Sequence, residues 1–425
     1  MWSSFMLLVS ALFLLTRAEA PTNPRIYSDR KAWGWCGWAQ GLPGMDDSEC
    51  RKKFPPLFDR EFRCPIVFDE KGQGFGDPVA SVGEAMKRMD ETELKDLDLP
   101  PTARFAAIVV RRSSSGGDDG GNYWVRYIGL NASSPYEPWS SSKVFAAANA
   151  AGRLQEVSQG EIGLQAFETG KGRQLADLMS IVTSYDHTMN MTSNSLGAYF
   201  HSIGGHREAN EYIHRVLGSP DIESFGGNYG EAPPPSLNYN FTVDNRTFLH
   251  LPIWPDPTPS PPLSNYMSAV TMATWLKSIV LAREDRLNGN VRWEDARDVL
   301  YGAEKSSMFP DLQWGGMSIS SDVYMQEALN ISLIDSLSRG RWRIFSKFGF
   351  GFTTVRQRYE TTLNSYLCAP VLDDMENPVP NRGLEVFVSG TVADKTKDRA
   401  ADAKMQDAMR RIMHHLQANY GGMEV

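Results

Sequence analysis

The chain has little of what nucleic-acid-binding proteins and metal centres need. Its 425 residues carry 43 basic and 51 acidic side chains, a net charge of −8, and no long Lys/Arg run that would suit a polyanion. Its 7 histidines and 4 cysteines show no CxxC pair and no HExxH or similar ligand spacing. A Gly-x-Ser-x-Gly elbow, a phosphate loop and a dinucleotide fingerprint are also missing. We therefore expect no nucleic-acid partner, no metal and no cofactor.

Long apolar runs are also scarce after the first twenty residues. An apolar run over residues 5–15 is followed by the small-residue pattern Ala-Glu-Ala at 18–20. Because the run is too short to span a bilayer, we interpret residues 1–20 as a signal peptide, with cleavage after the first or the second alanine. No later segment approaches the length of a membrane span, so we expect a secreted, extracellular chain with no membrane anchor after cleavage.

Sequons and cysteines agree with that compartment. Five Asn-x-Ser/Thr sites predict a glycoprotein, and the few cysteines fit disulfide bonds in an oxidising environment. Four cysteines allow three pairings, among which the sequence does not choose. The sequons begin at Asn131, Asn190, Asn240, Asn245 and Asn330, and the cysteines are Cys36, Cys50, Cys64 and Cys368.

The length indicates one large domain of two lobes, or two domains, with appendages. We interpret residues 21–78 as a Cys/Trp/Gly-rich N-terminal extension. An α/β lobe (79–138 and 335–425) is then interrupted by an all-α lobe (139–334), which predicts an antiparallel sheet flanked by helices. Strands are expected at 103–112, 122–130, 341–355, 356–372 and 383–393, and helices at 79–97, 140–154, 173–182, 193–203, 206–217, 265–284, 293–304 and 398–417. The Pro-rich segment 218–262 is expected to be a long irregular loop.

The segment WSSSKVFAAANAAGRLQ, residues 139–155, contains a Ser-x-x-Lys pattern. Ser140 and Lys143 lie one turn apart at the start of a predicted apolar helix, so the hydroxyl and the amine share one side of it. Unpaired backbone N–H groups there suit a developing oxyanion, and partial burial would lower the pKa of the lysine. The alternative is a capping serine with a snorkelling lysine. Ser28 and Lys31 match the same pattern but precede no apolar helix.

Two further segments follow in order. Thr192-Ser193-Asn194 stands at the start of the helix predicted over 193–203, where each hydroxyl could also be a simple N-cap. Lys347-Phe348-Gly349 lies in the strand predicted over 341–355, where a lysine could also be an edge-strand charge.

Together the three segments resemble the Ser-x-x-Lys, Ser-Asp-Asn and Lys-Thr-Gly set of class A β-lactamases and penicillin-binding proteins. The resemblance covers residues 79–425 and implies a β-lactamase/transpeptidase-like fold. It also implies a secreted serine hydrolase that forms an acyl-enzyme with a β-lactam or a related amide or ester, a small-molecule or peptide-like substrate. The sequence leaves the oligomeric state open.

The resemblance also implies roles for individual residues. Ser140 would be the nucleophile and Lys143 the base for acylation. Thr192, helped by Lys347, would pass a proton to the leaving nitrogen. The substrate-binding residues would be Asn194, which holds the amide side chain, and Gly349 and Phe350, where the backbone N–H groups of Ser140 and Phe350 form the oxyanion hole.

The sequence departs from the family at two places. Phe348 replaces the hydroxyl residue that binds the substrate carboxylate. The loop glutamate that activates the deacylating water lacks its usual spacing here, and Glu231 is the candidate for that base. These departures, and a sequon two residues before Thr192, leave two alternatives: a non-catalytic β-lactamase-like binding glycoprotein, or an esterase or peptidase on the same fold.

Overall fold

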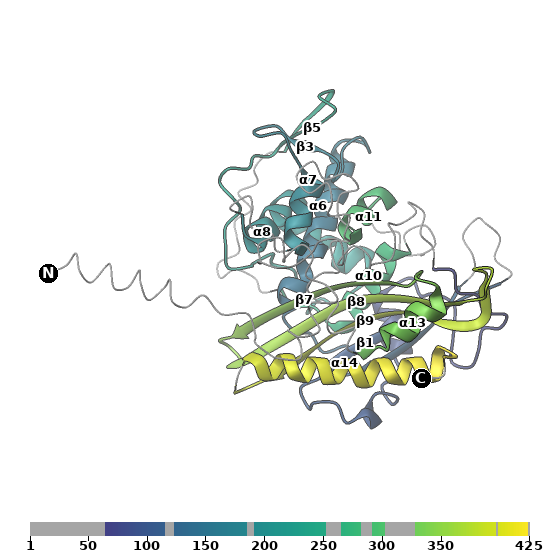
Figure 1. Ribbon diagram of the computed structural model, residues 1–425. Helices are drawn as coiled ribbons and strands as arrows, with labels where there is room; N and C mark the ends of the chain where they lie inside the picture. Colours follow the sequence, from purple (N-terminus) through teal and green to yellow (C-terminus); the bar gives the residue numbers. More distant parts are fainter. Residues whose placement is uncertain are drawn as a thin grey trace, which may run out of the picture.

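The structure is a computed structural model that describes residues 64–114, 123–184, 191–251, 265–281, 291–301, 328–396 and 398–423 (Figure 1). The predicted signal peptide, most of the N-terminal extension, Cys36, Cys50 and the Asn190 sequon lie outside the described residues. None of the described helices has both the length and the apolar character of a bilayer-spanning segment.

A five-stranded antiparallel sheet forms the base of the molecule. Its strand order, β2-β1-β9-β8-β7, places β7 at an edge and inserts the last strand of the chain beside the first. The predicted antiparallel fold class, with its hairpin and three-stranded meander, is therefore confirmed. The strands are β1 Arg104–Arg112, β2 Tyr123–Leu130, β7 Arg343–Thr353, β8 Arg358–Leu372 and β9 Pro378–Asp394.

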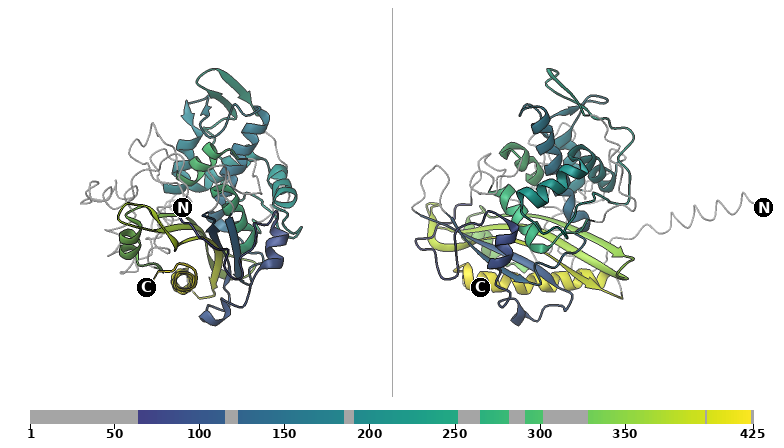
Figure 2. Two further views of the ribbon diagram at one scale, coloured as in Figure 1. Left: turned by 90° about the vertical axis from the view of Figure 1, so that its right-hand side faces the viewer. Right: turned by 180° about the vertical axis from the view of Figure 1, so that it is seen from behind.

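Alternating side chains of the sheet feed two separate cores. In β1, Ile108 and Val110 join the core under the helical lobe, whereas Phe105, Ala107 and Val109 face the other side. There the sheet packs against the methionine-rich face of α14, Asp398–Tyr420, and against the shorter α13, Ile331–Ser338. Figure 2 shows α14 end-on beneath the sheet, with the helical lobe on the opposite face.

The helical lobe is inserted between β2 and β7, as the element order predicts. Its centre is α6, Lys143–Val157, whose alanine-rich surface is almost entirely buried and packs against α8, Ser193–Gly204. Small side chains allow this close helix approach. The other helices in the described part of this lobe are α7 Leu175–Ser184, α9 His206–Glu211, the π-helical turn η3 Tyr212–Val216, α10 Ala269–Val280 and α11 Trp293–Tyr301.

The prediction of an irregular loop over 218–262 is wrong in part. This stretch contains the hairpin of β5, Asn240–Val243, and β6, Thr247–His250, which joins β3, Phe167–Glu168, and β4, Arg173–Gln174, in a second sheet. The hairpin turns at Asp244 and Asn245, with φ of 49° and 57°, a conformation that Asp and Asn tolerate.

Several predicted helix boundaries are also wrong, two of them for a clear reason. The helix expected from residue 173 begins at Leu175, because Arg173 and Gln174 pair with β3. The helix expected over 79–97 is split into α5, Val82–Arg88, and a 3₁₀ turn, Lys95–Leu97, because Asp90 is drawn to β2 through an isolated bridge to Ile128.

The described part of the N-terminal extension lies on the sheet. Phe68 forms a bridge with Ser113 and Gly76 with Val125, so this segment follows β1 and β2. A disulfide joins Cys64 to Cys368 in the second half of β8. The cross-link therefore fastens the extension to the same sheet that carries the predicted strand lysine.

Candidate active site

Ser140 lies in a 3₁₀ turn, η2, Trp139–Ser142, which runs directly into α6. Its neighbour Trp139 has a φ of +48°, a region that bulky side chains seldom adopt and that occurs preferentially at functional sites. The hydroxyls of Ser141 and Ser142 donate to the carbonyls of Pro138 and Trp139, at 2.5 and 2.8 Å. The half-buried Ser140 hydroxyl makes no hydrogen bond to a described residue, so it is the serine of this trio that is available for chemistry.

Strand β7 passes close against this turn. A Cβ atom at Gly349 would lie 2.6 Å from the Ser140 nitrogen and 2.7 Å from the Ser141 nitrogen, so only glycine allows the approach. The contact brings the Gly349–Phe350 backbone beside the N-terminal end of α6, where backbone N–H groups and the helix dipole favour negative charge.

Lys143, in the first turn of α6, is fully buried. Its Nζ donates to Ser193 Oγ at 2.7 Å and to Asn194 Oδ1 at 2.6 Å, and lies 5.4 Å from the centre of the Tyr229 ring. Burial lowers the pKa of Lys143 to about 7, while the charge of Glu231 acts in the opposite direction. At neutral pH a substantial fraction of this amine is uncharged and can accept a proton.

Lys347 in β7 is also fully buried, and its Nζ donates to its neighbouring carbonyl, that of Phe348, at 3.0 Å. Burial lowers the pKa of Lys347 well below its ordinary value, and the positive charge of Lys143 lowers it further. The two lysines therefore lie within range of each other's charge, and protonation of one disfavours protonation of the other.

Glu231 connects the remaining predicted residues at the exposed side of the site. One of its carboxylate oxygens accepts a hydrogen bond from Asn194 Nδ2 at 3.1 Å, and the other accepts from the hydroxyl of Thr192. Asn194 thus joins Lys143 to Glu231, and its side-chain amide is held at both ends. The carboxylate is solvent-accessible and stands beside a buried amine, a suitable arrangement for positioning water.

Not every predicted residue meets its predicted partner. Within the described chain no hydrogen bond joins Lys143 to Ser140, or Thr192 to either lysine. Thr192 is the N-cap of α8 and accepts from the Ser195 backbone N–H at 3.0 Å, so its hydroxyl is directed to the helix end and Glu231. The hydroxyl that contacts Lys143 is instead that of Ser193.

The sequence reasoning therefore missed Ser193 and Tyr229. Ser193 is the middle residue of Thr-Ser-Asn, but only its hydrogen bond with Lys143 Nζ identifies it as the partner of that lysine. Tyr229 carries no sequence signal. It approaches because Gly197 in α8 leaves room: a Cβ atom there would lie 3.0 Å from both Lys143 Cγ and the Tyr229 ring.

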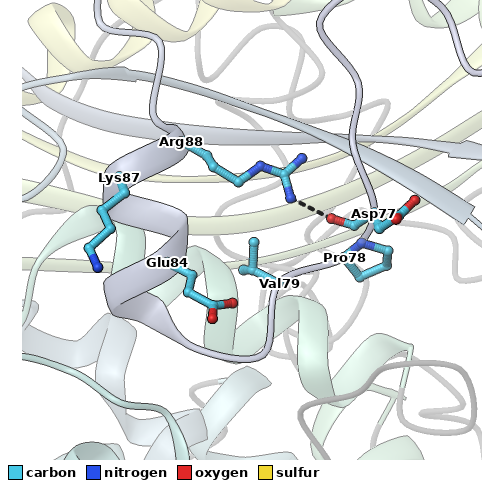
Figure 3. Close-up of a pocket in the computed structure, with 6 residues that line it drawn as sticks. All are labelled: Asp77, Pro78, Val79, Glu84, Lys87 and Arg88. Carbon is cyan, nitrogen blue, oxygen red and sulfur yellow. Dashed lines mark hydrogen bonds between the residues drawn. The ribbon is translucent and has the colours of Figure 1, made fainter.

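Other places in the described chain offer less chemistry. No group of three or more His, Cys, Asp or Glu residues among the described residues is placed to hold a metal ion. A surface hollow beside α5 is lined by charged and aliphatic side chains, with Arg88 donating to the Asp77 carbonyl at 2.5 Å (Figure 3). Its lining contains no Ser, Thr or Cys and none of the residues around Ser140.

Comparisons with known proteins give structural matches only. The chain matches no protein-family model and no curated protein sequence. A β-lactamase from Xanthomonas campestris is 13% identical, with coverage of 80% of this chain and 100% of the other and a TM-score of 0.40. The class A β-lactamase of the last common ancestor of Gram-negative bacteria is 13% identical, with coverage of 79% of this chain and 99% of the other and a TM-score of 0.40. PBP-A is 10% identical, with coverage of 80% of this chain and 98% of the other and a TM-score of 0.38.

Class A β-lactamases and penicillin-binding proteins recur among the similar structures. At TM-scores below 0.5, the chemistry of this chain has to be judged on its own contacts.

For the nucleophile role that the family resemblance implies for Ser140, the lowered pKa of Lys143 predicts a pH dependence of acylation. The rate should rise about tenfold per pH unit below about pH 7 and level off above it, because only the uncharged amine accepts a proton. Lys143→Arg, which stays charged, should lose at least about 10²-fold. Stopped-flow acylation rates from about pH 5 to about pH 9 test this, with the exposed Lys171→Arg as the control. A flat profile would contradict the role of Lys143.

Proposed function

We propose that the protein is a serine hydrolase that works through an acyl-enzyme on Ser140. One observation carries the proposal: Lys143, which is buried and has a lowered pKa, lies one helical turn from the half-buried Ser140. The residue before Ser140 has a strained backbone, and the backbone nitrogen of Ser140 lies against Gly349 of the edge strand β7. Caps and snorkelling lysines do not require this combination.

The chemistry follows from these positions. The Ser140 oxygen attacks a substrate carbonyl while its proton passes to uncharged Lys143, directly or through one water. The N–H groups of Ser140 and Phe350 stabilise the oxyanion, and loss of one such donor typically costs about 10²- to 10³-fold in rate. Collapse breaks the carbonyl–nitrogen or carbonyl–oxygen bond, and the leaving group takes the proton.

The proton that Lys143 takes from Ser140 would reach the leaving group through neighbouring hydroxyl and amine groups. Thr192 and Lys347 are the residues that the family resemblance assigns to this step, and Ser193 is a third candidate because it contacts Lys143 directly. Asn194 would orient the substrate's amide side chain. Glu231 would then activate the water that hydrolyses the Ser140 ester.

Secretion and the substrate class belong to the same proposal. The apolar leader and the sequons favour an extracellular glycoprotein, with a small amide or ester as substrate. A β-lactam is one member of that class, but Phe348 supplies no hydroxyl for its carboxylate, which favours an ester or an amide without that group.

A non-catalytic binding glycoprotein is the second candidate. It is favoured by Phe348 and by the lack of a hydrogen bond between Lys143 and Ser140 among the described residues. Such a protein would bind acyl compounds beside Ser140 without covalent labelling.

Substitution of the nucleophile tests the hydrolase directly. Wild-type protein exposed to a penicillin or an activated aryl ester should gain one acyl mass on the Ser140 peptide, measured by mass spectrometry. Ser140→Ala should lose this labelling by at least about 10⁴-fold, because the nucleophile is gone. Ser28→Ala, in the other Ser-x-x-Lys pattern, is the matched control and should label normally. Labelling that survives in Ser140→Ala would refute the mechanism.

Replacement of the loop carboxylate separates the two halves of the reaction. Glu231→Gln keeps the side-chain size but removes the base, so acylation should stay within about threefold while deacylation slows by at least about 10²-fold. The measurement is the lifetime of the acyl-enzyme after excess donor is removed. Glu211→Gln, an exposed glutamate of the same lobe, should leave that lifetime unchanged. Equal lifetimes for wild type and Glu231→Gln would exclude Glu231 as the base.

A further inference from the structure

The backbone of Trp139 requires an explanation that the catalytic residues do not provide. Its φ of +48° is unfavourable for a bulky side chain, so neighbouring contacts must hold it. The indole is half-buried and lies directly before Ser140 in η2. Any shift of Trp139 would therefore move the Ser140 hydroxyl and its backbone N–H together.

One side of the indole rests on β7. A Cβ atom at Gly351 would lie only 2.5 Å from Trp139 Cδ2, so the ring lies directly over this glycine. Gly351 is two residues after Gly349, whose missing side chain admits the Ser140 backbone. Gly349 thus packs against the backbone of η2, and Gly351 packs against the Trp139 ring of the same turn.

The other contact comes from the strand beside β7. Glu360 in β8 is the cross-strand partner of Gly351, and its fully buried Oε2 accepts from Trp139 Nε1 at 3.4 Å. Arg356 Nε and Arg358 Nε donate to its Oε1 at 3.0 and 2.8 Å. These charge-assisted bonds fix the orientation of a carboxylate that would be costly to bury alone.

We propose that Gly351 and Glu360 form a seat for the Trp139 indole, and that this seat holds the backbone of Trp139 so that Ser140 faces the substrate carbonyl. Gly351 supplies space and Glu360 supplies the hydrogen-bond acceptor. Glu360 is thus a positioning residue that acts through Trp139 without touching the substrate. The inference rests on the proposed function, because its catalytic readout is acylation of Ser140.

The test combines Trp139→Phe, Glu360→Gln and the double variant with measurements of acylation and of unfolding. Glu360→Gln should slow Ser140 acylation at least about tenfold at saturating donor, with KM little changed, because misplacement of the nucleophile affects the reactive geometry more than binding. The double variant should be no slower than the slower single variant, since Trp139→Phe removes the donor of this hydrogen bond and Glu360→Gln removes the negative charge of its acceptor.

Glu385→Gln is the matched control. Glu385 is also a buried carboxylate of the sheet, paired with Arg112 at 2.7 Å, but it lies in β9. This control should unfold more easily and still acylate at the wild-type rate per folded molecule. If Glu360→Gln behaves in the same way, Glu360 is merely structural and the seat is refuted.

Two further outcomes keep the seat testable. If Glu360→Gln does not fold, Gly351→Ala replaces it, and wild-type acylation in that variant overturns the proposal. If wild-type protein is never labelled on Ser140, the hydrolase function fails, and the seat is judged by unfolding midpoints alone. Shifts of Trp139→Phe and Glu360→Gln that add fully in the double variant contradict the seat, whereas a smaller combined shift supports it.

Discussion

Desolvation of two amines at the seam between the sheet and the helical lobe is the constraint on which the site depends. Lys143 enters the seam from α6 and Lys347 from β7, and both are fully buried. A buried ammonium is costly unless it is well paired, so the seam favours uncharged amines. The same burial that opposes stability converts Lys143 into a base near neutral pH.

Close packing of the β7 backbone against η2 places the two lysines and Ser140 at the same seam. In β7 the glycines at 349 and 351 alternate with Phe348, Phe350 and Phe352, so one face of the strand is bare where η2 approaches. The aromatic face stays partly exposed, and Phe350 stacks on Tyr359 with ring centres 6.1 Å apart. Strand β7 therefore provides the buried lysine, the room for the nucleophile and the glycine of the proposed seat, whereas its acceptor, Glu360, lies in β8.

The sheet and the three motifs of the candidate site could be predicted from the sequence, because each depends on a short stretch of neighbouring residues. The strand patterns and the order of Ser140, Thr192 and Lys347 are readable from spacing alone, and the antiparallel sheet follows from them. What could not be predicted depends on contacts distant in the chain. The partner of Lys143 is Ser193 because the Thr192 hydroxyl is used as a helix cap, and the φ of Trp139 depends on side-chain space and an acceptor supplied by β7 and β8.

The central claim is that a substantial fraction of Lys143 is uncharged at neutral pH in the resting protein. NMR of protein with ¹³C-labelled lysine ε-carbons, assigned with Lys143→Arg, measures this pKa without any substrate. The account predicts a lysine titrating near pH 7, far from the ordinary value of 10.5. A Lys143 resonance that titrates near 10.5 would contradict it, since a permanently charged amine could not take the Ser140 proton.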